Sequence, residues 1–83
     1  MVDEQFEATL FEKVGKIFRK DPSELSRETR FAEDLRAGSQ GMFALAATLG
    51  RMTGTAVSFT DVNQCATLGE ALDFADNLSQ ADA

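Results

Sequence analysis

The sequence predicts an all-α protein, a small four-helix bundle with a long first loop and a short third helix. Three segments carry apolar residues at helical spacing, whereas the alternation typical of a strand persists nowhere. The length of 83 residues bounds the chain to a single domain over residues 1–83. Its ordered core is expected over about residues 4–78, because the small polar residues that follow are of the kind that fray.

The first helix is expected from Glu4 to about Lys20, where Asp21-Pro22 stops it, since the residue before a proline is driven out of the helical region. Its apolar stripe consists of Phe6, Leu10, Val14 and Ile17 or Phe18, with Phe11 beside them. The long segment 23–38 that follows has no helical period. Its isolated apolar residues, which we expect to anchor it to the core, are Leu25, Phe31 and Leu35.

The second helix is expected to begin at Ser39, which would be its N-cap, and to end at Gly54 in a left-handed conformation. Its buried stripe consists of Met42, Leu45 or Ala46, Leu49 and Met52. A short third helix is expected within Thr60–Cys65, with Val62 and Cys65 facing inward. Thr67-Leu68-Gly69-Glu70 has the pattern of a capping box and opens a fourth helix. The apolar face of that helix consists of Leu68, Ala71 or Leu72, Ala75 and Leu78.

Composition excludes several classes of function. The net charge of −6 and pI near 4.4 argue against nucleic acid as a partner. Histidine is absent, so no Ser–His or Cys–His catalytic pair can form, and no metal site is expected from Cys65 and carboxylates alone. We therefore expect a protein that is not an enzyme. The single cysteine favours a reducing compartment, and with no apolar run long enough to span a bilayer and no basic leader, a cytoplasmic location is expected.

The loop and the start of the second helix resemble the acyl carrier protein family. The family motif has an apolar residue, Glu-Asp-Leu and then Gly-Ala-Asp-Ser-Leu, and this chain has Phe31-Ala32-Glu33-Asp34-Leu35 followed by Arg36-Ala37-Gly38-Ser39-Gln40. Thr55-Ala56-Val57 and the segment from Thr67 to Phe74 match later elements, so the resemblance extends from about Phe6 to Leu78.

The resemblance implies that Ser39 receives a 4′-phosphopantetheine arm whose thiol holds acyl groups as thioesters. The implied partners are a phosphopantetheinyl transferase and acyl-loading and acyl-transfer enzymes. A monomeric phosphoprotein of fatty acid biosynthesis or another branch of lipid metabolism is therefore expected. A phosphodiester at Ser39 would meet the positive end of the second helix, and Gly38 and Gly41 would leave the backbone open to a transferase.

Three residues around Ser39 depart from the family pattern. Gly38 replaces an aspartate that helps the transferase engage, Gln40 replaces a leucine that contacts partners, and Arg36 replaces a glycine. The family places acids along the second helix, but residues 37–60 here contain no acid and one base, Arg51. We expect enzymes that dock on an acidic second helix to recognise this protein poorly, and we expect it to serve a specialised pathway.

Two sets of residues are candidates for recognition. The candidates for partner binding are Gln40, Met42, Phe43, Arg51 and Val57, with Met42, Phe43 or Arg51 partly exposed. The candidates for an acyl pocket between the second and third helices are Ala46, Leu49, Val57 and Val62. Close helix packing is an equally supported explanation of the small residues of the second helix.

Two other interpretations stay open. One takes Ser39 as a helix cap alone and the chain as an unmodified helical adaptor that has kept the carrier fold. Asp34 could orient the loop or contact a transferase, but a solvated loop carboxylate is the preferred interpretation. A small helical DNA-binding domain is disfavoured by the negative charge.

Overall fold

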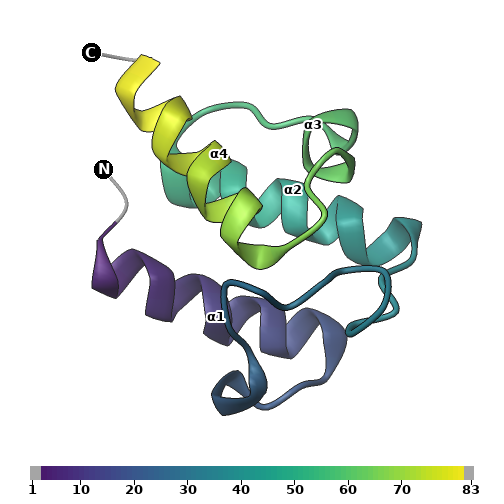
Figure 1. The fold of residues 1–83 in the computed structure, drawn as a ribbon. Coiled ribbons are helices and arrows are strands. Elements are labelled where there is room, and N and C mark those ends of the chain that lie inside the picture. Colours follow the sequence, from purple (N-terminus) through teal and green to yellow (C-terminus); the bar gives the residue numbers. More distant parts are fainter. Residues whose placement is uncertain (1–2, 82–83) are drawn as a thin grey trace.

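The computed structural model describes the backbone of residues 3–81 and the side chains of residues 3–78. Its helices are α1 (Glu4–Phe18), α2 (Ser39–Thr53), α3 (Phe59–Asn63) and α4 (Leu68–Ala81), with a single 3-10 turn, η1 (Pro22–Glu24), after α1. Figure 1 shows α1 beneath α2 and α4, the long loop crossing in front, and the short α3 at the right. The expected all-α bundle is confirmed, and no strand occurs among residues 3–81.

One core joins the helices and the loop. Its innermost side chains, all fully buried, are Leu10, Val14, Leu45, Leu49, Val62, Leu68 and Leu72. They come from all four helices at the apolar positions that the periodicity predicts. None of the helices within residues 3–81 has the length and apolar character that crossing a bilayer requires.

The end of α1 is set by Arg19, a little earlier than the proline alone predicts. Arg19 takes a left-handed conformation (φ 59°), and its N–H donates to the Gly15 carbonyl, as does the N–H of Lys20 at 2.8 Å. Asp21-Pro22 then opens η1, where the Asp21 carboxylate accepts from the Ser23 N–H at 2.9 Å. The C-terminal cap therefore ends α1 before Asp21-Pro22 can.

The short helix α3 begins one residue before the expected Thr60 because Ser58 caps it. The Ser58 hydroxyl accepts from the Asp61 N–H, and the Asp61 carboxylate accepts from the Ser58 N–H, which completes a capping box. Val62 faces inward as expected, but Cys65 lies beyond the helix and is only half-buried. At the start of α4, the Thr67 hydroxyl accepts from the Glu70 N–H. The Glu70 carboxylate accepts from the Ala66 N–H, whereas in a regular capping box it would accept from the N–H of Thr67 itself.

The long loop is held against the start of α4 by its backbone. Phe31 N–H donates to the Ala66 carbonyl at 3.0 Å, Leu68 N–H donates to Thr29 at 2.9 Å, and Gly69 N–H donates to Arg27 at 2.8 Å. An isolated antiparallel bridge between Arg30 and Thr67 results. The three apolar loop residues, Leu25, Phe31 and Leu35, are buried as the sequence predicts. The loop is thus an ordered layer of the fold.

Phe31→Ala is expected to lower the free energy of unfolding by about 3–5 kcal/mol, because it empties the site that a 3% exposed ring fills. Urea denaturation followed by circular dichroism measures the change. The matched control is Glu33→Ala in the same loop, which removes only an exposed ion pair with Arg30 and should cost less than about 1 kcal/mol. Equal effects of the two substitutions would contradict anchoring by Phe31, and Phe31→Leu covers the case in which the alanine variant does not fold.

Candidate functional site

Ser39 is the first residue of α2, and Gly38 is its N-cap. Gly38 has extended backbone angles (φ −95°, ψ −178°), and its carbonyl accepts from the Met42 N–H at 3.1 Å. The expectation that Ser39 caps the helix is therefore wrong. The Ser39 side chain is exposed, and its hydroxyl makes no hydrogen bond with any residue that the structure describes. The hydroxyl is thus available for chemistry at the positive end of the helix.

The first turn of α2 packs against the end of α1. A methyl group built on Gly41 would overlap the ring of Phe18, whereas nothing lies within 4 Å of the corresponding position at Gly38. Gly38 therefore leaves the backbone open, as expected, but Gly41 serves helix packing. The Phe18 ring also meets that of Phe31, with ring centroids 6.4 Å apart, so one aromatic side chain ties α1 to both α2 and the loop.

The loop before Ser39 is shaped by Asp34 and Arg36. The Asp34 carboxylate accepts from the Arg30 N–H at 2.8 Å, while the Asp34 N–H donates back to the Arg30 carbonyl at 3.0 Å. Arg36 takes a left-handed conformation (φ 51°), which is the reason why a glycine suits this position in the family motif. Of the two roles considered for Asp34, orientation of the loop is the one that these bonds support.

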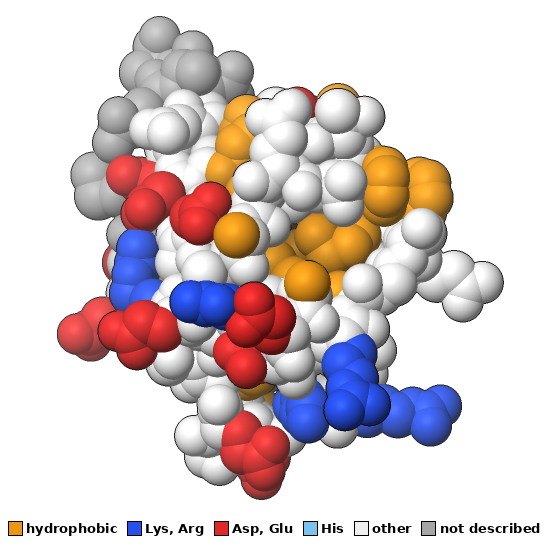
Figure 2. Space-filling view, turned by 45° about the vertical axis from the view of Figure 1, so that its right-hand side comes forward, with side chains coloured by type: hydrophobic (Ala, Val, Ile, Leu, Met, Phe, Trp, Pro, Cys, Tyr) orange, Lys and Arg blue, Asp and Glu red, His pale blue; other side chains and the backbone are white. Residues whose placement is uncertain are grey.

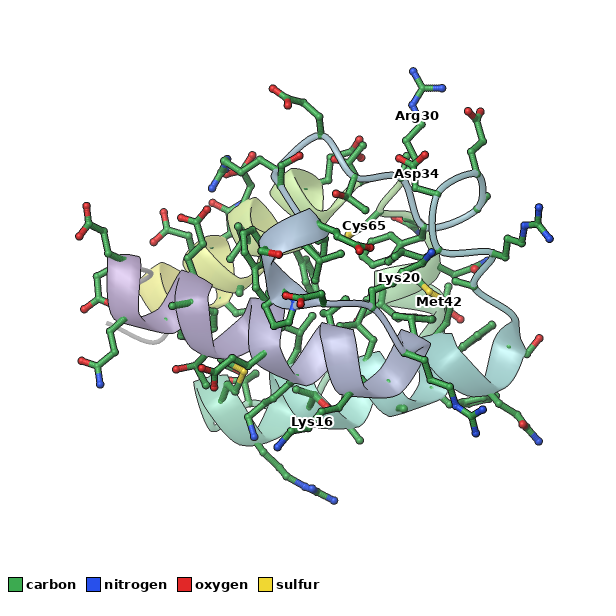
Figure 3. The ribbon with its side chains drawn as sticks, turned by 90° about the horizontal axis from the view of Figure 1, so that it is seen from below. Lys16, Lys20, Arg30, Asp34, Met42 and Cys65 are labelled. Atoms are coloured by element: carbon green, nitrogen blue, oxygen red, sulfur yellow. The ribbon has the colours of Figure 1, made fainter. Side chains whose placement is uncertain are left out.

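A cavity of about 470 Å³ opens beside the first turn of α2. Its apolar lining includes Phe31, Ala37, Met42 and Cys65, and its charged residues are Arg30, Glu33 and Glu70. Figure 2 shows a hydrophobic hollow in the middle of this face, and Figure 3 places Met42 and Cys65 beneath the loop that carries Arg30 and Asp34. Ser39 does not itself line the cavity, but Met42, which does, lies one helical turn after it.

The four residues expected to line an acyl pocket between α2 and α3 do not line this cavity. Ala46, Leu49 and Val62 are buried in the core, Val57 is half-buried, and none of them lines the 470 Å³ cavity. A Cβ on Gly50 would come within 3.1 Å of the Thr55 carbonyl oxygen, which is a close contact. These observations favour close helix packing as the reason for the small residues of α2.

The expected partner-binding residues divide into an exposed set and a buried one. Gln40 and Arg51 are exposed, and Phe43 is 59% exposed, the large hydrophobic residue most open to solvent among those described. The expectation that Met42 is partly exposed is wrong: it is 4% exposed because it lies one turn before Leu45 on the inward face.

Phe59, which no sequence pattern singled out, is half-buried and packs against the core beside the exposed Phe43. Its ring stacks on that of Phe43, with centroids 4.4 Å apart and an angle of 24° between the planes. The Ser58 capping box fixes the first turn of α3 and hence the position of Phe59. The pattern Ser-x-x-Asp at residues 58–61 could have located this turn.

Cys65 is the thiol in the cavity wall. Burial raises the pKa of Cys65 above its ordinary value, and the negative charges of Glu70 and then Asp61 raise it further. The thiol is therefore protonated at neutral pH and a poor nucleophile. Within the described part of the chain, no group of three or more His, Cys, Asp or Glu side chains is placed to hold a metal ion.

Comparison with known proteins agrees with the geometry around Ser39. A family model described as a phosphopantetheine attachment site matches residues 8–75, which include the loop, the start of α2 and most of α4. A search of curated proteins finds no significant match. Because the family match covers well over half of the sequence, the chain belongs to the phosphopantetheine attachment site family and is a carrier domain of the acyl carrier protein type.

Proposed function

We propose that this protein is an acyl carrier protein, with 4′-phosphopantetheine attached to Ser39 and acyl groups held on the arm as thioesters. The observation that carries the proposal is the exposed, unbonded Ser39 hydroxyl within the family match. In the attachment, the hydroxyl loses its proton and its oxygen bonds to the 4′-phosphate phosphorus of coenzyme A, while the adenosine 3′,5′-bisphosphate leaves. The protein itself performs no catalysis in this proposal, because the reactive thiol belongs to the arm.

The start of α2 fits the phosphodiester that this reaction creates. Gly38 makes no side-chain cap, and the N–H groups of the first turn have no acceptor within the helix. These N–H groups and the helix dipole favour an anion at Ser39. Nothing lies within 4 Å of the missing Cβ of Gly38, so a transferase could approach the backbone closely. A hydroxyl without a hydrogen bond and a helix end without a side-chain cap thus support the same modification.

The cavity beside Met42 is the proposed site for the acyl group. The arm would leave the surface at Ser39 and return over the first turn of α2, where Phe31, Ala37, Met42 and Cys65 provide apolar contacts. The charged residues Arg30, Glu33 and Glu70 that line the cavity favour a short acyl group over a long aliphatic chain. The pocket expected at Ala46, Leu49, Val57 and Val62 is the alternative site for the acyl group.

Partner enzymes are proposed to dock on the exposed surface of α2 and α3. Phe43 stacked on Phe59 supplies an apolar anchor, and the other candidate contacts are the exposed Gln40 and Arg51 of α2 and the half-buried Val57 that follows it. Because no acid occurs from residue 35 to residue 60, enzymes selected for an acidic α2 would find no complementary charge. We place the protein in a specialised lipid or acyl-transfer pathway of the cytoplasm, acting as a monomer.

The modification is tested by intact-mass measurement after incubation with coenzyme A and a broad-specificity phosphopantetheinyl transferase. The parent is expected to gain one phosphopantetheinyl group and Ser39→Ala none. Circular dichroism of Ser39→Ala should remain unchanged, because the hydroxyl makes no hydrogen bond in the fold. If neither this enzyme nor transferases from the protein's own source modify the parent, the unmodified adaptor becomes the better interpretation.

Cys65 is expected to react slowly with iodoacetamide near pH 7, and its rate is expected to rise until the pH passes a pKa above that of an ordinary cysteine. The sign follows from the thiolate being the reactive form: a raised pKa lowers its fraction at neutral pH. Mass spectrometry of the Cys65 peptide across a pH series measures the rate. Glu70→Gln should move the inflection downward, since it removes one of the charges that raise the pKa. An inflection at or below the ordinary cysteine value would contradict the burial.

The same peptide reports whether an acyl group enters the cavity. A butyryl group loaded onto the arm is expected to slow alkylation of Cys65 several-fold relative to the unmodified protein. The reason is that Cys65 lines the cavity, so a butyryl group inside it would cover the thiol. Ser39→Ala, taken through the same loading reaction, is the control and should keep the unmodified rate. Equal rates in the loaded and unmodified proteins would show that the acyl group stays outside.

A further inference from the structure

Arg36 is the only charged residue from Leu35 to Gly50, so the chain segment that contains Ser39 is positively charged although the chain has a net charge of −6. Arg19 directly follows Phe18, whose ring packs on Gly41 in the first turn of α2, and Arg36 precedes Ser39 by three residues. We name these two exposed residues, Arg19 and Arg36, the arginine rim. Figure 2 shows basic side chains gathered below the hydrophobic hollow, apart from the mixed charges at the left. The end of α1 therefore contributes charge to the α2 site.

The charge of the arginine rim is not neutralised within the protein. Arg27 and Arg30 pair with carboxylates at 2.8 and 3.0 Å, whereas neither Arg19 nor Arg36 makes an ion pair with any residue for which side chains are described. The acids nearest in sequence, Asp21 and Asp34, keep their charge but accept from the Ser23 and Arg30 N–H groups, and among the described side chains neither forms an ion pair with Arg19 or Arg36.

Lys20, although next to Arg19, belongs to a different surface. It lines a separate hollow of about 400 Å³ together with Glu24, Glu28 and Asp34. Figure 3 shows Lys20 on the side of the loop that carries Asp34, and Lys16 on the side of α2. Acids therefore balance Lys20, and it is left out of the arginine rim.

We propose that the enzyme that modifies Ser39 approaches it through an acidic docking surface that complements the arginine rim. The proposal rests on the proposed function, because it takes Ser39 as the attachment site. From Leu35 to Thr60 the chain presents no negative charge that an acidic surface would have to overcome. The stacked Phe43 and Phe59 rings provide an apolar contact on the same helix and its neighbour, so charge and apolar anchor act together.

An anionic membrane is the other negatively charged partner to consider. Two arginines provide little attraction to a lipid surface, while the remaining charges of a chain with net −6 are repelled by it. A protein surface can place its acids against the arginine rim alone. The observations therefore favour a protein partner.

The test is the second-order rate constant for modification of Ser39 by a transferase from the protein's own source, measured from roughly 0.02 to 0.3 M salt. The parent rate is expected to fall as salt rises, because screening weakens attraction between exposed opposite charges. Arg36→Glu should lower the rate at low salt by about 10-fold and remove most of the salt dependence. Arg36→Gly, which also relieves the left-handed conformation, should lower it by a smaller factor.

The matched control changes the net charge equally but at the opposite end of the molecule. Gln5→Glu combined with Asn77→Asp adds two negative charges at exposed positions near the start of α1 and on α4, both distant from the start of α2 (Figure 1). Its rate should stay within about twofold of the parent, since the effect of exposed charges falls off over the Debye length. Circular dichroism of each variant confirms that it is folded.

The outcomes separate the two proposals. A parent that is modified at the same rate as Arg36→Glu, or whose rate rises with salt, overturns the acidic docking surface and leaves Ser39 as the attachment site. A parent that no transferase modifies overturns the proposed function itself. Flotation with vesicles of phosphatidylserine and phosphatidylcholine should recover no protein. Binding to these vesicles that Arg36→Glu abolishes would overturn the protein partner in favour of a membrane.

Discussion

The contact of the Phe18 ring with Gly41 and Phe31 is the constraint on which the geometry of the site depends. It sets the distance between α1 and α2 at the end where Ser39 lies, since a methyl group at Gly41 would already overlap the ring. It also fixes the loop, because Phe31 packs on the same ring and its backbone bonds to Ala66 before α4. One side chain of α1 thus contacts both α2 and the loop at this end of the bundle, and the backbone of the loop in turn bonds to the segment at the start of α4.

The sequence predicts the helices and the loop anchors well because their signals are local. Apolar spacing in α1, α2 and α4 identifies which faces are buried. Isolated apolar residues of the loop, such as Phe31 and Leu35, leave water only by packing on the core, so their burial can be predicted. Gly54 ends α2 in the left-handed conformation that its position predicts. These features depend on neighbours a few residues away.

The details of the site depend on contacts between distant segments and could not be predicted in the same way. Whether Gly38 or Ser39 caps α2 is decided by the path of the loop, in which Arg36 is left-handed and Ala37 bonds to the Phe31 carbonyl. The partner of Phe43 is a ring from α3, and the cavity wall combines the loop, α2 and the segment before α4. The family motif located Ser39, but only the packing identified its surroundings.

The separation of charge has a consequence for how the molecule turns in solution. The arginine rim, which forms no ion pair among the described side chains, lies at the end of α1 and just before α2. The acids of α4 and of the start of α1 outnumber the single base Arg51 at the end of α2, so the charge is distributed unevenly and the protein has a dipole moment. A dipole experiences a torque in the field of another macromolecule before any contact forms. The field of a negatively charged surface would rotate the end bearing Ser39 toward it. The charge distribution of the fold would then orient Ser39 toward such a surface during diffusion, before any contact forms.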